Sequence, residues 1–207
     1  MKIIESATRT EAALLACEML AGDLRRALSS NTRAGLIVSG GSTPRECLQF
    51  LSGEDLPWHQ VDISLTDERC VPVNHEASNE GMVRRLLCEG PASKASFLNV
   101  GKLNLKHLAV SLVGMGEDGH FASIFPDSPV LADLIDVDAP PDRCEANPTS
   151  SQYRRITVNL SYLLRSNRIV LLAFGERKRL LLEQPGGLPV EMLIKQDKTP
   201  VVAVWAP

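Results

Sequence analysis

The stretch AGLIVSGGSTPRE, residues 34–46, decides the fold class. It begins with a short apolar run of β-forming residues, and two glycines, Gly40 and Gly41, end that run. In the following TPRE, Thr43 is placed to cap a helix, proline takes the first helical position and Glu46 the third. The stretch therefore predicts a strand, a glycine turn and a helix, the repeating unit of an α/β protein.

The same alternation continues on both sides of this stretch. Upstream, Thr8 and Glu11 form a capping box, and apolar residues at helical spacing predict a helix that runs to about Leu28. Downstream, segments of helical pattern separate five further predicted strands, VDISLTDE, LAVSLVGMG, RRITVNL, RIVLLAFG and PVVAVWA. This alternation predicts a mainly parallel sheet covered by helices, and the length of 207 residues fits one domain over residues 1–207.

Composition excludes several classes of protein. With 44% hydrophobic and 23% charged residues, the chain resembles an ordinary globular protein, and no apolar stretch approaches the roughly 18 residues of a membrane span. The first 15 residues lack the basic region and unbroken apolar core of a secretion signal, so we expect a cytoplasmic protein with no membrane partner. A net charge of −3 gives no reason to expect nucleic-acid binding. The five cysteines never form C-x-x-C, so neither a disulfide framework nor a zinc site is expected.

The stretch GMGEDGHFASIFP, residues 114–126, contains the Gly-x-Gly-x-x-Gly pattern of a dinucleotide-binding turn directly after an apolar run. In such a turn the third glycine leads into a helix, whereas Pro126 and Pro129 here prevent a long regular helix. We therefore interpret the stretch as a shaped loop. It would hold His120 at the end of a strand, with Asp118 close enough to fix the tautomer or orientation of the imidazole.

Two other loops also follow predicted strands. SGGSTP offers backbone N–H groups at a helix N-terminus, where a phosphate would fit, although a plain tight turn is the alternative. TDERCVP places Asp67, Glu68 and Arg69 together, although surface charge is the alternative there. Because ligands bind beyond the carboxyl ends of parallel strands, we expect these loops and the His120 loop to form one site.

Five motifs in this order, SGGSTP, DERCVPVNHEASN, GMGEDGHFASIFP, RRIT and GERK, resemble the 6-phosphogluconolactonase family over about residues 35–178. The resemblance implies a doubly wound, Rossmann-like α/β fold with helices on both faces, shared with the glucosamine-6-phosphate deaminases. It also implies hydrolysis of 6-phosphoglucono-1,5-lactone to 6-phosphogluconate in the oxidative pentose phosphate pathway, with no metal or organic cofactor. The small-molecule lactone would be the partner, and the chain would be a monomer or a homodimer.

The resemblance implies a role for each motif residue. His120 would be the general base that activates water, Asp118 would orient it, and Arg69 would position the lactone and stabilise the developing oxyanion. The phosphate would be held by the glycine loop and closed in by two basic residues, the set being Gly40, Gly41, Ser42, Thr43, Arg155 and Lys178. Three further residues would shape the pocket: Asp67, Glu68 and Asn79.

The sequence departs from the family pattern at two places. Phe121 stands where the family more often has threonine, so contacts beside the base are expected to differ. Between FLNV and LAVSLVGMG only residues 101–107 remain, too few for the crossover helix that the family usually has. We therefore expect one missing helix, with the exposed apolar face covered either by residues 136–152 or by a second subunit.

Three other functions fit the sequence less well. A deaminase of the same fold usually continues its D-G-H turn with a glutamate-containing segment, which FASIFP lacks. A non-catalytic sugar-phosphate sensor would not need His120 and Arg69, and no helix-turn-helix accompanies the motifs. For a nicotinamide enzyme, no clear strand precedes the candidate ribose-binding acids Asp133, Asp136 and Asp138.

Overall fold

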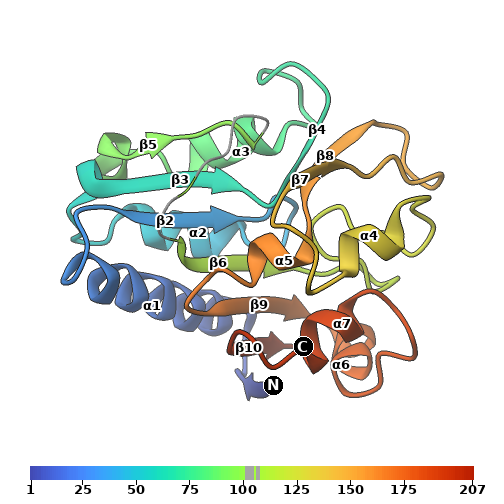
Figure 1. The fold of residues 1–207 in the computed structure, drawn as a ribbon. Coiled ribbons are helices and arrows are strands. Elements are labelled where there is room, and N and C mark those ends of the chain that lie inside the picture. The colour runs from blue at the N-terminus through green and yellow to red at the C-terminus, as the bar shows by residue number, and fades with distance from the viewer. Residues whose placement is uncertain (101–104, 106–107) are drawn as a thin grey trace.

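The computed structural model describes residues 1–100, 105 and 108–207 (Figure 1). Its main sheet has seven strands in the order β1-β10-β9-β6-β2-β3-β5, and each neighbouring pair is parallel. The strands of this sheet are β1 (Lys2–Glu5), β2 (Ala34–Val38), β3 (Val61–Leu65), β5 (Ser96–Phe97), β6 (Leu108–Gly114), β9 (Ile169–Phe174) and β10 (Val201–Ala206). The predicted parallel α/β fold is confirmed.

Helices connect the strands and cover the sheet. They are α1 (Arg9–Leu28), α2 (Arg45–Ser52), α3 (Asn79–Leu86), α4 (Leu131–Ile135), α5 (Leu160–Leu163), α6 (Glu176–Glu183) and α7 (Val190–Lys195), with 3-10 turns η1 (Trp58–Gln60) and η2 (Gly90–Lys94). From β2 the chain adds β3 and β5 on one side of the sheet, and from β6 it adds β9 and β10 on the other side. With right-handed connections, α1 to α3 therefore lie on one face of the sheet and α5 to α7 on the other. None of the described helices is long and apolar enough to cross a membrane.

The two predicted helix caps have different outcomes. At α1 the N-cap is confirmed, since Thr8 Oγ1 accepts from the N–H of Glu11 at 3.1 Å and α1 ends at Leu28. The Glu11 carboxylate accepts in return from the N–H of Ala7, one residue before the cap, at 3.0 Å. The cap predicted for α2 is wrong: α2 begins at Arg45 after Pro44, and no side chain among the described residues caps it. The Glu46 carboxylate accepts a hydrogen bond from Thr10 of α1 at 2.9 Å, a contact between the two helices rather than part of a cap.

A second, antiparallel sheet was missing from the sequence prediction. It has the order β4-β8-β7, formed by β4 (Asp67–Arg69), β8 (Arg155–Val158) and β7 (Arg143–Glu145). RRITVNL is therefore not a parallel strand of the main sheet, and residues 136–152 contain a strand as well as loop. In the β4–β8 register Arg69 lies opposite Arg155, which brings two distant motifs together.

Of FLNV, Phe97 joins the parallel ladder, because β5 (Ser96–Phe97) pairs with β3 at the edge of the main sheet, and the three residues that follow are outside any strand. Within residues 136–152, strand β7 pairs with β8 in the small antiparallel sheet and not with β5 at the edge of the main sheet (Figure 1). The expected absence of a helix in residues 101–107 falls, apart from Leu105, outside the described residues.

Candidate active site

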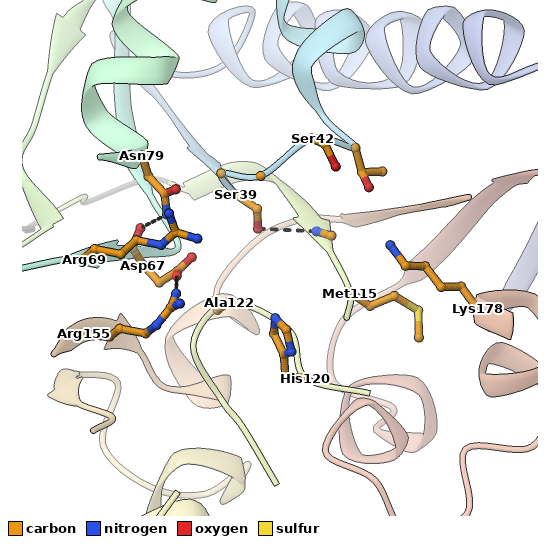
Figure 2. Close-up of a pocket in the computed structure, with 14 residues that line it drawn as sticks. Ser39, Ser42, Asp67, Arg69, Asn79, Met115, His120, Ala122, Arg155 and Lys178 are labelled. Atoms are coloured by element: carbon orange, nitrogen blue, oxygen red, sulfur yellow. Dashed lines mark hydrogen bonds and ion pairs between the residues drawn. The ribbon is translucent and has the colours of Figure 1, made fainter. Parts of the chain in front are cut away.

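A cavity of about 170 Å³ lies where β2, β3, β6 and β9 end (Figure 2). Because these four strands are neighbours in the sheet, the loops that follow them meet at one edge. Ten of the predicted site residues line the cavity: Gly40, Gly41, Ser42, Thr43, Asp67, Arg69, Asn79, His120, Arg155 and Lys178. The three predicted site loops therefore meet at one cavity, as the order of the strands requires.

The loop after β6 holds His120 in one orientation. Oδ1 of Asp118 lies 2.6 Å from the imidazole Nδ1 and also accepts from the backbone N–H of His120 at 3.2 Å. Gly116 leaves room for this pair, and Gly119, at φ +76°, turns the chain between the two side chains. Because a carboxylate only accepts hydrogen bonds, Nδ1 carries the proton and Nε2 keeps the lone pair that a general base needs.

An aromatic ring completes the surroundings of His120. The imidazole stacks on Phe125, with ring centroids 4.1 Å apart and planes inclined by 22°. The guanidinium carbon of Arg155 lies 5.1 Å from the centroid of the same ring. Phe121, in contrast, is fully buried, bridges to Met115 and Ile124 and does not line the cavity.

The glycine loop after β2 is shaped by close packing and by a left-handed turn. A Cβ at Gly40 would lie 1.9 Å from Oδ1 of Asn79, so only glycine fits beneath that side chain. Gly41 has φ +92°, a conformation that other residues rarely adopt. The turn leads past Ser42, whose side chain Figure 2 shows beside the cavity, into the N-terminus of α2. Backbone N–H groups at such a helix start suit an anion.

Asp67 is a buried carboxylate with both oxygens engaged. Oδ1 accepts from Thr66 Oγ1 at 2.8 Å, and Oδ2 accepts from Ser123 Oγ at 2.5 Å. Oδ2 also lies 3.7 Å from Nη1 of Arg155, which itself donates to Ser123 at 3.4 Å. Asp67 therefore ties β4, β8 and the His120 loop together and neutralises part of the positive charge.

Three cationic side chains border the cavity. Arg69 donates from Nη1 to the carbonyl of Ala77 at 2.7 Å, across from Arg155 in the β4–β8 register. Burial lowers the pKa of Arg155, partly offset by Asp67, and burial also lowers the pKa of Lys178. Figure 2 shows Lys178 extending from α6 toward the cavity. Partly desolvated cations of this kind gain free energy when an anion binds between them.

Glu68 does not line the cavity. Its carboxylate accepts from the backbone N–H groups of Asn79 at 2.8 Å and Glu80 at 2.7 Å, and from Ser78 Oγ at 3.0 Å, so it holds the start of α3. The reason is strand alternation: in β4, Asp67 and Arg69 face one side and Glu68 the other. Asp118 also lies outside the lining but contacts His120 directly.

Sequence reasoning missed several residues of the site. Four of them line the cavity: Ser39, Gly114, Met115 and Ala122. Two more, Ser123 and Phe125, contact the lining side chains. The available signal was their position, because all six lie within the SGGSTP and GMGEDGHFASIFP motifs.

A metal centre finds no support in the described part of the chain, where no group of three or more His, Cys, Asp or Glu side chains could hold an ion. The five cysteines, all within that part, are free thiols. The chemistry available to the cavity is that of an imidazole base, two guanidinium groups, an ammonium group and the backbone of the glycine loop.

Comparison with known proteins identifies the family. The model of the glucosamine-6-phosphate isomerases/6-phosphogluconolactonase family matches residues 7–109 and 92–204. The chain belongs to this family. A 6-phosphogluconolactonase of Caulobacter vibrioides is 35% identical over 211 residues, covering 92% of this chain and 91% of that protein. One from Pseudomonas aeruginosa is 34% identical, covering 93% and 89% of the two chains.

Solved structures of family members are also similar. The crystal structure of a 6-phosphogluconolactonase from Shewanella baltica has a TM-score of 0.91 at 31% identity, covering 100% of this chain and 98% of that one. A monomeric glucosamine-6-phosphate deaminase has a TM-score of 0.77 at 17% identity, with 100% and 97% covered. The second likeness shows the shared fold alone.

Proposed function

We propose that this chain hydrolyses 6-phospho-D-glucono-1,5-lactone to 6-phospho-D-gluconate. The observation that carries the proposal is the placement of an oriented base, His120, in the same cavity as Arg69, Arg155 and Lys178. The family relatives at 34–35% identity that bear the name 6-phosphogluconolactonase support the same reaction. We also propose that residues 1–207 act as one domain.

His120 acts as the general base in this mechanism. Its Nε2 takes a proton from a water molecule while the water oxygen forms a bond to C1 of the lactone, and Asp118 stabilises the resulting imidazolium through Nδ1–H. The carbonyl oxygen becomes an oxyanion, which Arg69 stabilises. When the tetrahedral intermediate collapses, the bond from C1 to the ring oxygen breaks. The imidazolium returns its proton to that oxygen, and the product is the open acid.

The phosphate group sets the position of the lactone. It binds the backbone of the glycine loop with Ser42 and Thr43, and Arg155 and Lys178 close around it. Asp67 and Asn79 keep this end of the cavity in shape. Binding of the phosphate thereby holds C1 of the lactone close to His120 in the orientation that the reaction needs.

The acids of the cavity favour the lactonase over an amino-sugar phosphate deaminase. Among the described lining residues Asp67 is the one carboxylate, and hydrogen bonds and Arg155 occupy both of its oxygens. Opening a sugar ring benefits from an acid beside the histidine, and FASIFP provides none. Lactone hydrolysis needs no ring-opening acid, because the ring opens when the ester bond breaks.

The deciding experiment compares two substrates. Hydrolysis of freshly prepared 6-phosphogluconolactone, corrected for the spontaneous reaction, is expected to be fast, and deamination of glucosamine 6-phosphate is expected to be absent. The reverse pattern would assign the chain to the deaminase branch of the family.

We place the reaction in the oxidative pentose phosphate pathway of the cytoplasm, which the motif resemblance supports.

A further inference from the structure

Phe125 touches both functional halves of the cavity. Its ring stacks on His120 with centroids 4.1 Å apart, and the guanidinium carbon of Arg155 lies 5.1 Å from the same ring centroid. Phe125 is buried, with 7% of its surface exposed, so its ring is enclosed by protein atoms. We propose that Phe125 is a positioning residue that sets the plane of the catalytic imidazole and the place of the phosphate-binding guanidinium together.

The hydrogen bond from His120 to Asp118 does not fix the imidazole by itself. A single contact at Nδ1 holds one atom of the ring but lets the plane tilt about that contact, and a tilt moves Nε2, which must meet the attacking water. Stacking on an aromatic face restricts this tilt because the two rings lie nearly parallel, at 22°. Asp118 and Phe125 thus fix complementary degrees of freedom of one side chain.

Arg155 is held in a comparable way. Its nitrogen atoms contact Ser151 at 2.9 Å, Ser123 at 3.4 Å and the Asp67 carboxylate at 3.7 Å, while its guanidinium carbon lies over the ring of Phe125. A cation over an aromatic face is attracted to it, more strongly where water is excluded, as at this half-buried arginine. Because one ring serves both neighbours, the distance between the base and the phosphate site is set by a single rigid group.

The inference rests on the proposed function, and a substitution in the same loop supplies a matched control. Phe125→Leu removes the shared ring and keeps an apolar side chain. Phe121→Leu removes a fully buried ring four residues earlier that lies outside the cavity lining. Both variants are measured on 6-phosphogluconolactone and on gluconolactone without phosphate, at a temperature where urea unfolding shows them folded.

Phe125→Leu is expected to lower kcat about tenfold on both lactones, through His120, and to raise KM about fivefold on the phosphorylated lactone alone, through Arg155. Phe121→Leu is expected to keep both constants. If Phe125→Leu has wild-type constants, or if both variants lose kcat equally, the inference is wrong. Failure of the wild type itself to hydrolyse the lactone would instead contradict the proposed function.

An NMR measurement gives a readout that does not depend on activity. The His120 ring-proton signals, assigned by their loss in His120→Ala, are expected to be displaced by the ring current of Phe125. They should move toward the positions of an unstacked histidine in Phe125→Leu and stay in place in Phe121→Leu. Signals that do not move in Phe125→Leu would show that the stack is not formed in solution, and would overturn the proposal.

Discussion

Gly116 lies so close to the His120–Asp118 pair that it has no room for a methyl group. A Cβ there would lie 2.3 Å from Nδ1 and Cε1 of His120 and 2.4 Å from Oδ1 of Asp118, whereas ordinary contact begins at 3.4 Å. In Gly116→Ala the imidazole must therefore retreat by roughly 1 Å. A misplacement of that size is expected to lower kcat about 100-fold, equivalent to about 2.7 kcal/mol in the activation barrier.

The loss should be kinetic rather than structural. The backbone of Gly116 lies outside the left-handed region and the residue is half-exposed, so alanine is conformationally allowed. The free energy of unfolding should therefore change by less than about 1 kcal/mol. Turnover of fresh lactone, affinity for 6-phosphogluconate and urea unfolding are measured together. Gly53→Ala is the control, because its nearest neighbouring atom would be 3.6 Å from the Cβ. A folded Gly116→Ala with more than half of the wild-type kcat would refute the reasoning.

Three further predictions concern the phosphate end of the cavity. Gly40→Ala forces Asn79 from its place and breaks its 3.0 Å hydrogen bond to the carbonyl of Asp67. The free energy of unfolding, measured in urea, should therefore fall by about 2–4 kcal/mol, and a fall below about 0.5 kcal/mol would contradict the packing. Lys178→Ala should raise KM for the phosphorylated lactone and leave gluconolactone hydrolysis unchanged, whereas equal losses on both would indicate misfolding. Burial lowers the pKa of Lys178, so the ammonium loses its charge as the pH rises through a value below the ordinary lysine pKa of about 10.4. The affinity for 6-phosphogluconate should fall over the same pH range, and a Lys178→Arg variant should show no such fall. A wild-type affinity that does not change with pH would argue against the contact.

Local signals in the sequence predicted the elements that local interactions determine. The capping box at Thr8 and Glu11 acts within one turn of helix, and it marked α1 correctly. The similar pattern at Thr43 and Glu46 placed the start of α2 too early, since α2 begins at Arg45, and Glu46 bonds instead to Thr10 of α1, a tertiary contact that no local pattern contains. The β4–β8–β7 sheet was missed because strands of three or four residues carry little periodicity, and because β4 lies far along the chain from β7 and β8.

The site was predictable where residues follow strands of the main sheet. The carboxyl ends of parallel strands meet at one edge, so the SGGSTP loop and His120 had to be neighbours. VDISLTDE was predicted as one strand, whereas Asp67–Arg69 form the separate strand β4. Strand alternation within β4 separates Glu68 from Asp67 and Arg69. Phe125 was missed because an apolar residue in a loop looks like packing until its two charged or titratable neighbours are known.

The assignment of His120 as the base is tested most directly by the turnover of His120→Ala on freshly prepared 6-phosphogluconolactone, measured together with its affinity for 6-phosphogluconate. Because His120 transfers a proton and the phosphate is held elsewhere, kcat should fall by about 10²–10⁴-fold while the affinity stays within about twofold of the wild type. Turnover at the wild-type rate in the folded variant would contradict the assignment. Equal loss of turnover and affinity would contradict the separation of base and phosphate site.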